Sequence, residues 1–179
     1  MITEQLLLQH LHEGDRKAQR ELYERFAGLA MATAMRYVGN TDDACDVLQD
    51  SFVKAFASLD RFAYRGEGSL RAWLLRIVSN QAVNFLRRQA RITFTDKLPD
   101  DLPDEEPDVG TVPLEVLQQL IASLPTGYRT VFNLYVLEQK SHREIAELLG
   151  ISEATSSSQL LRAKRMLAKL ITDYQKRQQ

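Results

Sequence analysis

The histidines and the cysteine of this 179-residue chain are placed poorly for catalysis or metal binding. His10 and His12 are two residues apart, so on a helix they point to different faces and make a poor metal pair. His142 stands beside an expected helix cap, and the lone Cys45 lies near an apolar helix face where packing explains it. No glycine-rich phosphate loop or paired acid–base set appears. We therefore predict a protein that is not an enzyme and needs no metal or cofactor.

Arginine and asparagine side chains instead form a pattern that suits nucleic acid. Residues 61–91 carry seven arginines and one acid, which gives this block a charge of +6. Basic groups neutralise phosphates, and aromatic rings stack on unpaired bases. An ordinary solvated helix face is the alternative, and Trp73 is expected in the core because it lies within the apolar stripe. The candidate contacts are Tyr64, Arg65, Arg71, Arg76, Asn80, Asn84, Arg87 and Arg88.

The stretch from Ser141 to Leu167 predicts a helix-turn-helix. Ser141 and Glu144 have the spacing of a capping box, and Gly150 supplies the positive φ that the turn requires. The small side chain of Ala146 allows the two helices to approach closely. The inward positions are apolar, namely Ile145, Leu149 and Ile151.

The second helix of this motif begins with uncharged side chains, from Thr155 to Gln159. Hydroxyls and amides hydrogen-bond phosphates or base edges, and a helix N-terminus adds free N–H groups. A basic half suited to the DNA backbone follows with Arg162, Lys164, Arg165 and Lys169. For the serine run alone, a solvated polar face is an equally good interpretation.

Apolar residues recur at helical spacing on both sides of a polar segment, so we predict an all-α fold of two small helical domains. The expected buried faces include Leu29 and Val53, while Thr41 and Ser69 are placed to cap helices. Seven acids and several prolines between residues 92 and 112 indicate an extended acidic linker, or a merely flexible connector. The predicted parts are residues 1–91, 92–112 and 113–179.

The composition, with 44% hydrophobic and 26% charged residues, is that of a globular protein. No apolar run approaches the roughly 20 residues of a membrane span, and the N-terminus lacks a signal-peptide pattern. One cysteine fits a reducing compartment, so we predict a cytoplasmic protein without membrane insertion. The charge alternates between −4, +6, −6 and +3 over residues 1–60, 61–91, 92–112 and 113–179, which indicates several partner surfaces.

The chain resembles extracytoplasmic-function (ECF) sigma factors, the minimal initiation subunits of bacterial RNA polymerase. The resemblance extends from about Glu21 to Leu170 and rests on three segments in order: DVLQDSFVKAF, WLLRIVSNQAVNFLRR and LPTGYRTVFNLYVLEQKSHREIAELLGISEATSSSQLLRAKRML. It implies that core RNA polymerase and promoter DNA are partners, together with an anti-sigma factor. The competing hypothesis is a stand-alone helix-turn-helix regulator, which leaves the first half of the chain without a role.

The resemblance also implies roles for particular residues. The family's D-x-x-Q-[DE] motif, on the helix that docks to the polymerase clamp, corresponds to Asp46, Gln49 and Asp50. The loop at residues 62–69 and the arginine-rich helix after it would capture a flipped base and grip the −10 element. The acidic linker resembles the segment that threads toward the polymerase active-site cleft. The −35 element would be contacted by His142, Arg143, Thr155, Ser157, Ser158, Gln159, Arg162 and Arg165.

The start of the second helix of the motif departs from the family pattern. Many members have Thr-Val-Lys-Ser-Arg where this chain has Thr155 to Gln159. Because Ser157 and Gln159 replace two basic residues, we expect a shallower salt dependence and an altered base preference. Ser156 stands at an apolar position of the family, so it is either a DNA contact or an imperfect core residue.

Overall fold

The computed structural model describes residues 2–97 and 107–178, whose regular secondary structure is entirely helical. This confirms the all-α prediction. The chain forms two compact units, Met1–Phe85 and Leu86–Gln179. Pro99, Pro103 and most of the acids of the expected linker lie outside the described residues. No helix in the described part of the chain is long and apolar enough to cross a membrane.

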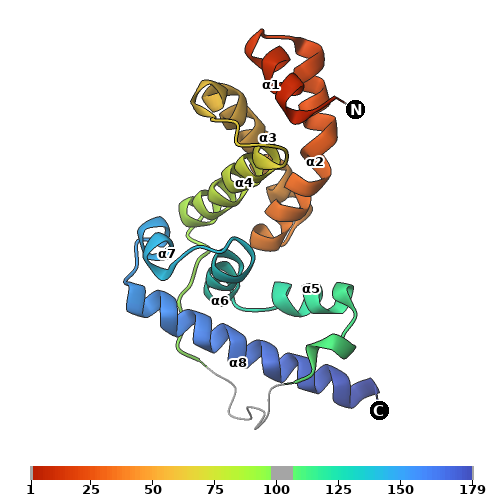
Figure 1. Ribbon diagram of the computed structural model, residues 1–179. Helices are drawn as coiled ribbons and strands as arrows, with labels where there is room; N and C mark the ends of the chain where they lie inside the picture. Colours follow the sequence, from red (N-terminus) through yellow and green to blue (C-terminus); the bar gives the residue numbers. More distant parts are fainter. Residues whose placement is uncertain (1, 98–106, 179) are drawn as a thin grey trace. The chain divides into compact units, whose positions relative to one another are not determined.

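The first unit is built on the antiparallel neighbours α1, α2 and α3, which are followed by a long fourth helix (Figure 1). Its helices are amphipathic, and their apolar sides form a core that includes the fully buried Leu22, Leu74 and Val78. The helices of this region agree with the expected small helical domain. Their bounds are α1 (Glu4–His12), α2 (Arg16–Val38), α3 (Thr41–Ser58) and α4 (Ser69–Arg88), with a 3₁₀ turn η1 (Leu59–Arg61) before the loop that leads to α4.

Two apolar residues that were expected in the core lie on the surface. Leu29 is 48% exposed and Val53 is 70% exposed. The apolar stripes of α2 and α3 are wider than the surfaces that these helices bury, so residues at the stripe edges face solvent. Cys45 on α3 is also exposed. The α3 cap lies one residue earlier than expected, because the side chain of Asn40 accepts the N–H of Asp43.

The start of α4 is capped by Glu4, a residue of α1 that is far from α4 in the sequence. The first N–H groups of a helix have no partners within the helix, and a carboxylate near them is favourable. Glu4 Oε2 accepts the N–H of Gly68 at 2.8 Å and of Leu70 at 3.1 Å. Glu4 is only 2% exposed. Ser69, the cap expected from the sequence, instead donates its hydroxyl to the Gly66 carbonyl at 2.6 Å.

The loop before α4 is tied to α1 and α2 by the same network. Gly66 and Gly68 have φ values of 110° and 88°, which residues with a Cβ rarely adopt. Glu67 Oε2 accepts the N–H of Glu4 at 3.3 Å, and Glu67 Oε1 pairs with Arg25 Nη2 at 3.3 Å. The conformation of this loop is therefore set jointly by the N-terminal helix and by α2.

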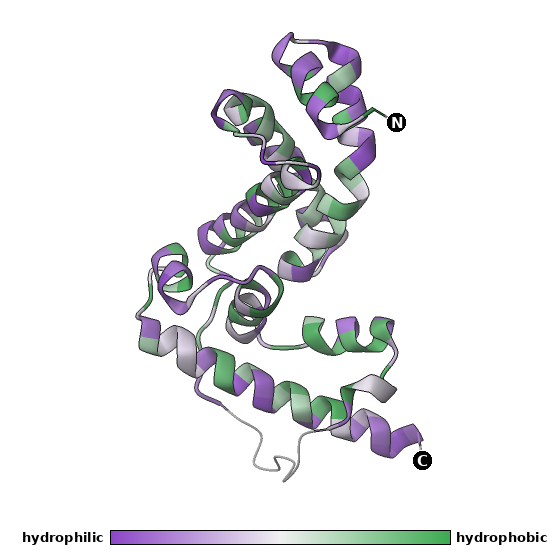
Figure 2. Cartoon of the chain, viewed as in Figure 1, coloured by the Kyte–Doolittle hydropathy of each residue, from purple (hydrophilic) through white to green (hydrophobic). Residues whose placement is uncertain are grey.

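The second unit is organised around α8, its longest helix, which α5, α6 and α7 all contact (Figure 1). Apolar and polar residues alternate along α8, as Figure 2 shows, and its apolar side contributes Leu160, Ala163 and Ile171 to the core. The helix-turn-helix at the end of this unit was expected from the sequence, and the helix α6 before it continues into a π-helical turn. The bounds are η2 (Val109–Thr111), α5 (Leu114–Ala122), α6 (Thr126–Phe132), η3 (Asn133–Leu137), α7 (His142–Leu149) and α8 (Glu153–Gln178).

The Glu4 cap predicts a large effect on the stability of the first unit. Glu4→Ala leaves two backbone N–H groups without their acceptor, so we expect the free energy of unfolding to fall by roughly 1–3 kcal/mol. Glu4→Gln retains an acceptor oxygen and should lose less. Urea denaturation followed by fluorescence measures this directly, because Trp73 is the only tryptophan and lies in this unit.

The matched control is Glu24→Ala, which removes a carboxylate that pairs with Arg20 on the exposed surface of α2. Exposed pairs of this kind contribute little, so the midpoint should barely move. Equal shifts for Glu4→Ala and Glu24→Ala would contradict the capping role.

Candidate nucleic-acid interface

The loop before α4 and the first turns of α4 enclose a hollow of about 340 Å³. An aromatic pair forms part of its wall, because the ring centroids of Phe62 and Trp73 lie 4.9 Å apart. The position of Trp73 corrects the core assignment, since this side chain is half-buried and faces the hollow. The remaining lining is basic or small. The lining residues are Arg61, Phe62, Ala63, Arg65, Ser69, Ala72, Trp73 and Arg76.

The chemistry of this hollow suits an unpaired base next to a phosphate. Guanidinium groups are donors only, so Arg61, Arg65 and Arg76 bind carbonyl, ring-nitrogen or phosphate acceptors. An aromatic wall offers a stacking surface for a base. Sequence reasoning did not single out Arg61, although it belongs to the same arginine-rich block. Its position in the turn η1, outside the α4 periodicity, explains the omission.

The other residues predicted for the −10 element are distributed more widely. Arg71 borders a separate hollow together with Glu4, Arg25 and Glu67. Tyr64 donates to Glu67 Oε2 at 3.4 Å, and desolvation together with the Glu67 charge raises the pKa of its phenol, which keeps it protonated. Farther along α4, Asn80 and Asn84 are half-buried while Arg87 and Arg88 are exposed. The structure thus brings Arg65 and Arg76 together but leaves Arg71 apart.

The motif predicted to bind polymerase lies on the surface of α3. Asp46, Gln49 and Asp50 are all exposed, and a spacing of three to four residues places them on one side of the helix. Val53 continues this side and is 70% exposed. An exposed apolar residue beside carboxylates is typical of a surface that docks a protein partner. The sequence signal for Val53 was missed because its spacing also fits the buried stripe.

The second unit contains the helix-turn-helix that the sequence predicts. Ser141 and Glu144 form a complete capping box, with the Glu144 N–H donating to Ser141 Oγ and the Ser141 N–H to Glu144 Oε2. Gly150 ends α7 with a φ of 68°. Ser152 Oγ then accepts the N–H of Thr155 at 3.0 Å and caps α8. These local contacts fix where α8 begins.

Ser156 is an internal residue of this motif. It is fully buried, and its hydroxyl lies 2.9 Å from Nδ1 of His142. The ring of His142 also stacks on Tyr135, with centroids 4.6 Å apart. Of the two roles considered for Ser156, the core position is the one that the structure supports. His142, a predicted DNA contact, is half-buried and directs Nδ1 into the motif.

Gln159 is also buried, which contradicts its predicted role as an exposed base contact. It is 1% exposed, and its Nε2 donates to the carbonyl oxygen of Thr95 at 2.8 Å. The expectation failed because nothing in the sequence around α8 shows that residues 92–97 lie against it. The Nε2 group of this glutamine therefore bonds within the chain.

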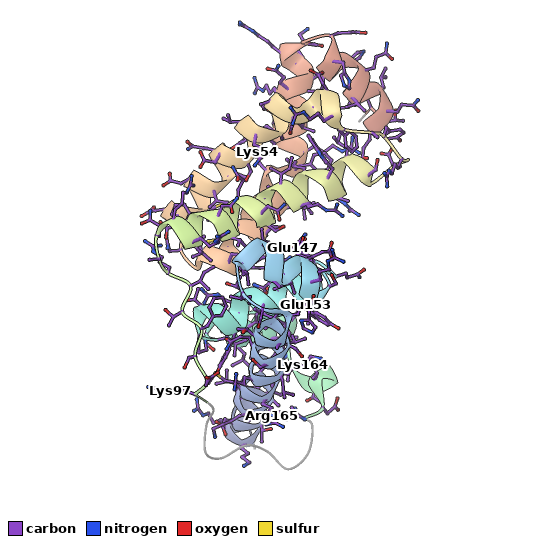
Figure 3. The ribbon with its side chains drawn as sticks, turned by 90° about the vertical axis from the view of Figure 1, so that its left-hand side faces the viewer. Lys54, Lys97, Glu147, Glu153, Lys164 and Arg165 are labelled. Atoms are coloured by element: carbon purple, nitrogen blue, oxygen red, sulfur yellow. The ribbon has the colours of Figure 1, made fainter. Side chains whose placement is uncertain are left out.

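The remaining residues predicted for the −35 element are accessible to different degrees. Thr155 and Ser158 are half-buried, whereas Ser157, Arg143 and Arg165 are exposed. Arg162 is 26% exposed and pairs with Asp96 at 2.6 Å. Lys164 and Arg165, labelled in Figure 3, extend the basic surface along α8. Fewer uncharged groups at the start of α8 face solvent than the sequence predicts.

The contact between Ser156 and His142 predicts coupled stability. Ser156→Ala and His142→Ala should each destabilise the protein, and the double variant should lose less than the sum. The expected coupling is about 1 kcal/mol, because both changes remove one hydrogen bond. Thermal and urea unfolding of the four proteins measure it. Ser157→Ala, an exposed neighbour, is the control, and an additive double-mutant cycle would contradict the bond.

Comparisons with known proteins agree with this arrangement of two helical units. Residues 22–92 match the family model described as Sigma-70 region 2, and residues 114–167 match Sigma-70, region 4. The ECF RNA polymerase sigma-E factor of Haemophilus influenzae is 33% identical over 180 residues, covering 93% of this chain and 94% of that protein. The protein of the same description from Escherichia coli K12 is 31% identical over 178 residues, or 91% of each chain.

Two solved structures are also similar. CnrH in complex with the cytosolic domain of CnrY is 30% identical with a TM-score of 0.50, covering 94% of this chain and 96% of that chain. The sigma factor RpoE in complex with the anti-sigma factor NepR from Bartonella quintana shares the fold at 22% identity and a TM-score of 0.53, over 86% of this chain and 96% of that one. By its sequence and its two helical units, this chain belongs to the sigma-70 family, among the ECF RNA polymerase sigma factors.

Proposed function

We propose that this protein directs core RNA polymerase to promoters by binding the −10 element with its first unit and the −35 element with its second. The observation that carries the proposal is the hollow in front of α4, where three arginines and the Phe62–Trp73 pair converge. Such a site suits a base that has left the duplex, because it offers a stacking surface and donors at once. Strand opening then needs no catalytic residue, since captured bases supply the binding energy.

The polymerase-binding surface in this proposal is the exposed side of α3. Asp46 and Asp50 supply negative charge, and Gln49 and Val53 supply a polar and an apolar contact between and beside them. Charge of one sign around an apolar contact favours a partner with the opposite charge and gives the interface its register. The match of residues 22–92 to Sigma-70 region 2 supports the assignment.

The −35 surface in this proposal is the exposed part of α8 together with the start of α7. Exposure favours Ser157, Lys164 and Arg165 as contacts, and Arg143 adds a phosphate contact from α7. Arg162 is partly exposed and would bind DNA by exchanging its partner Asp96 for a phosphate. Gln159 is left out because it is buried. With two family basic residues absent, we expect a shallow salt dependence of −35 binding.

An anti-sigma factor is a further proposed partner. The relative RpoE was solved in complex with an anti-sigma factor. The surface of this chain offers exposed apolar side chains suited to protein contact on α3 and on the η3 turn, including Val53 and Val136. The acidic linker at residues 92–112 is proposed to follow a path toward the polymerase active-site cleft, as in the family that it resembles.

The experiment that tests the proposal is promoter selection with the reconstituted holoenzyme. Core RNA polymerase and this protein are incubated with a library of random upstream sequences, and transcribed templates are sequenced. We expect two enriched elements, near −10 and −35, that core polymerase alone does not select. A dimeric footprint on palindromic duplex without polymerase, and no selection with it, would indicate a stand-alone regulator instead.

On a selected promoter, loss of a hollow arginine should impair opening more than polymerase binding. Arg76→Ala removes a charged donor from the hollow, so we expect about tenfold less open complex. Reactivity of unpaired thymines with permanganate measures the open complex. Arg20→Ala, on the exposed surface of α2, is the control with the same charge change. Equal losses for the two variants would assign the effect to overall charge.

Reversing charge on α3 should weaken association with core polymerase. For Asp46→Lys combined with Gln49→Ala we expect the affinity to fall about tenfold or more, because a carboxylate that meets a basic partner becomes repulsive. Pull-down and fluorescence titration with core polymerase measure this. Glu13→Lys, exposed at the end of α1, changes the charge equally and should bind normally. Unchanged binding of the α3 variant would remove this surface from the proposal.

A further inference from the structure

The segment Ile92–Lys97, which enters the acidic linker, lies against α6 and α8 within the second unit. Its backbone carbonyls serve as acceptors for two side chains of that unit. Gln159 Nε2 donates to the Thr95 oxygen at 2.8 Å, and the Tyr128 hydroxyl donates to the Lys97 oxygen at 2.7 Å. Burial is the main effect that raises the pKa of Tyr128, so its hydroxyl stays protonated and keeps donating. Both donors are buried, at 1% and 0% exposure.

The close approach of this segment depends on a glycine. A Cβ on Gly127, at the start of α6, would lie 2.5 Å from the Thr93 oxygen and 3.2 Å from Phe94 Cδ1. No real side chain tolerates the first distance, and the atom concerned is backbone. Gly127 has no positive φ, so the tight contact with residues 93 and 94 accounts for the glycine better than the helix geometry does.

The same segment also neutralises a basic residue of α8. Asp96 Oδ1 lies 2.6 Å from Nη1 of Arg162. The Asp96 side chain is 83% exposed, whereas that of Arg162 is 26% exposed. An ion pair with one partner largely in water contributes little net stability, so another anion exchanges with it readily. A DNA phosphate is such an anion, and a guanidinium binds carboxylate and phosphate in the same way.

We propose that Ile92–Lys97 is an intramolecular strap that occupies part of the DNA-facing surface of α8 and lowers the DNA affinity of the free protein. This role for the strap rests on the proposed contact of Arg162 with DNA. Asp96 stands where a phosphate oxygen would bind. The Thr95 and Lys97 carbonyls anchor the segment by accepting hydrogen bonds from the buried Gln159 and Tyr128. Because the strap is the first part of the linker, a partner that draws the linker away also uncovers Arg162. DNA reading is thereby coupled to polymerase association.

The test uses the full-length protein and a fluorescein-labelled DNA duplex of random sequence. Two variants release the strap in different ways. Asp96→Asn removes the charge that holds Arg162, and Gly127→Ala pushes Thr93 off α6. Each should raise duplex affinity by about two- to fivefold, the size expected for an exposed ion pair. The slope of log affinity against log salt should steepen by about one, because Arg162 then releases one more counterion.

Asp108→Asn is the matched control. It removes the same charge at a described linker residue. The Asp108 side chain accepts the Gly110 N–H, and an asparagine side chain at this position can accept the same hydrogen bond. The gain must also disappear in Asp96→Asn combined with Arg162→Ala. Circular dichroism melting confirms that each variant is folded, and Asp96→Asn decides the matter should Gly127→Ala be unstable.

Two results overturn the strap. One is equal duplex binding by wild type, Asp96→Asn and Asp108→Asn, including no binding by any of them. The other is weaker binding by Asp96→Asn, which would mean that the segment supports DNA contact. Neither result touches promoter selection by the holoenzyme, so the strap can fail while the proposed function stands. If selection fails but the Arg162-dependent gain is present, the intramolecular contact survives without that function.

Discussion

Every α-helix begins with N–H groups that its own backbone cannot satisfy, and in this protein the start of α4 is half-buried at Gly68 and Ser69 and buried at Leu70. One carboxylate meets that requirement, because Glu4 accepts the N–H groups of both Gly68 and Leu70. These hydrogen bonds hold the end of the loop that lines the arginine-rich hollow. Arg65 and Ser69 of the hollow therefore take their positions from a residue on α1, far from them in sequence.

Polar groups are used in a similar way inside the helix-turn-helix. Ser156 and Gln159 are both buried: the Ser156 hydroxyl lies beside Nδ1 of His142, and Gln159 Nε2 donates to the Thr95 carbonyl, whereas Gln159 Oε1 has no hydrogen-bond partner in the described part of the chain. A buried polar group without a partner is costly, so His142 and the Thr95 carbonyl are needed for these residues to be tolerated. The proposed DNA surface consequently begins farther along α8 and depends on Arg162, Lys164 and Arg165.

Acidic groups set the state of the two basic surfaces. Glu67 pairs with Arg25 and accepts from Tyr64 beside the hollow, and Asp96 pairs with Arg162 on α8. Ion pairs with one partner largely in water are weak, and a polyanion competes with them effectively at low salt. The near-zero net charge thus conceals basic sites that are partly neutralised within the chain. At Arg162, the proposed contact with DNA exchanges one anion, Asp96, for another, a phosphate.

The sequence by itself determined the features that depend on neighbouring residues. Helical periodicity, the capping box of Ser141 and Glu144, and the positive φ of Gly150 involve contacts within a few positions, so the all-α class and the helix-turn-helix were predictable. The exposed carboxylates of α3 were predictable for the same reason, although their partner was suggested only by the family resemblance.

Only the tertiary structure decided which residues of equal pattern are buried, paired or free to bind. Glu4 caps α4 from 64 positions away, and Gln159 bonds Thr95 across the same separation. Val53 and Leu29 share the apolar spacing of core residues, yet both are exposed among the residues that the structure describes. Trp73 follows the apolar stripe but faces the hollow. Local rules specify a helix and its faces, whereas burial and partnership depend on which distant segment packs against each face.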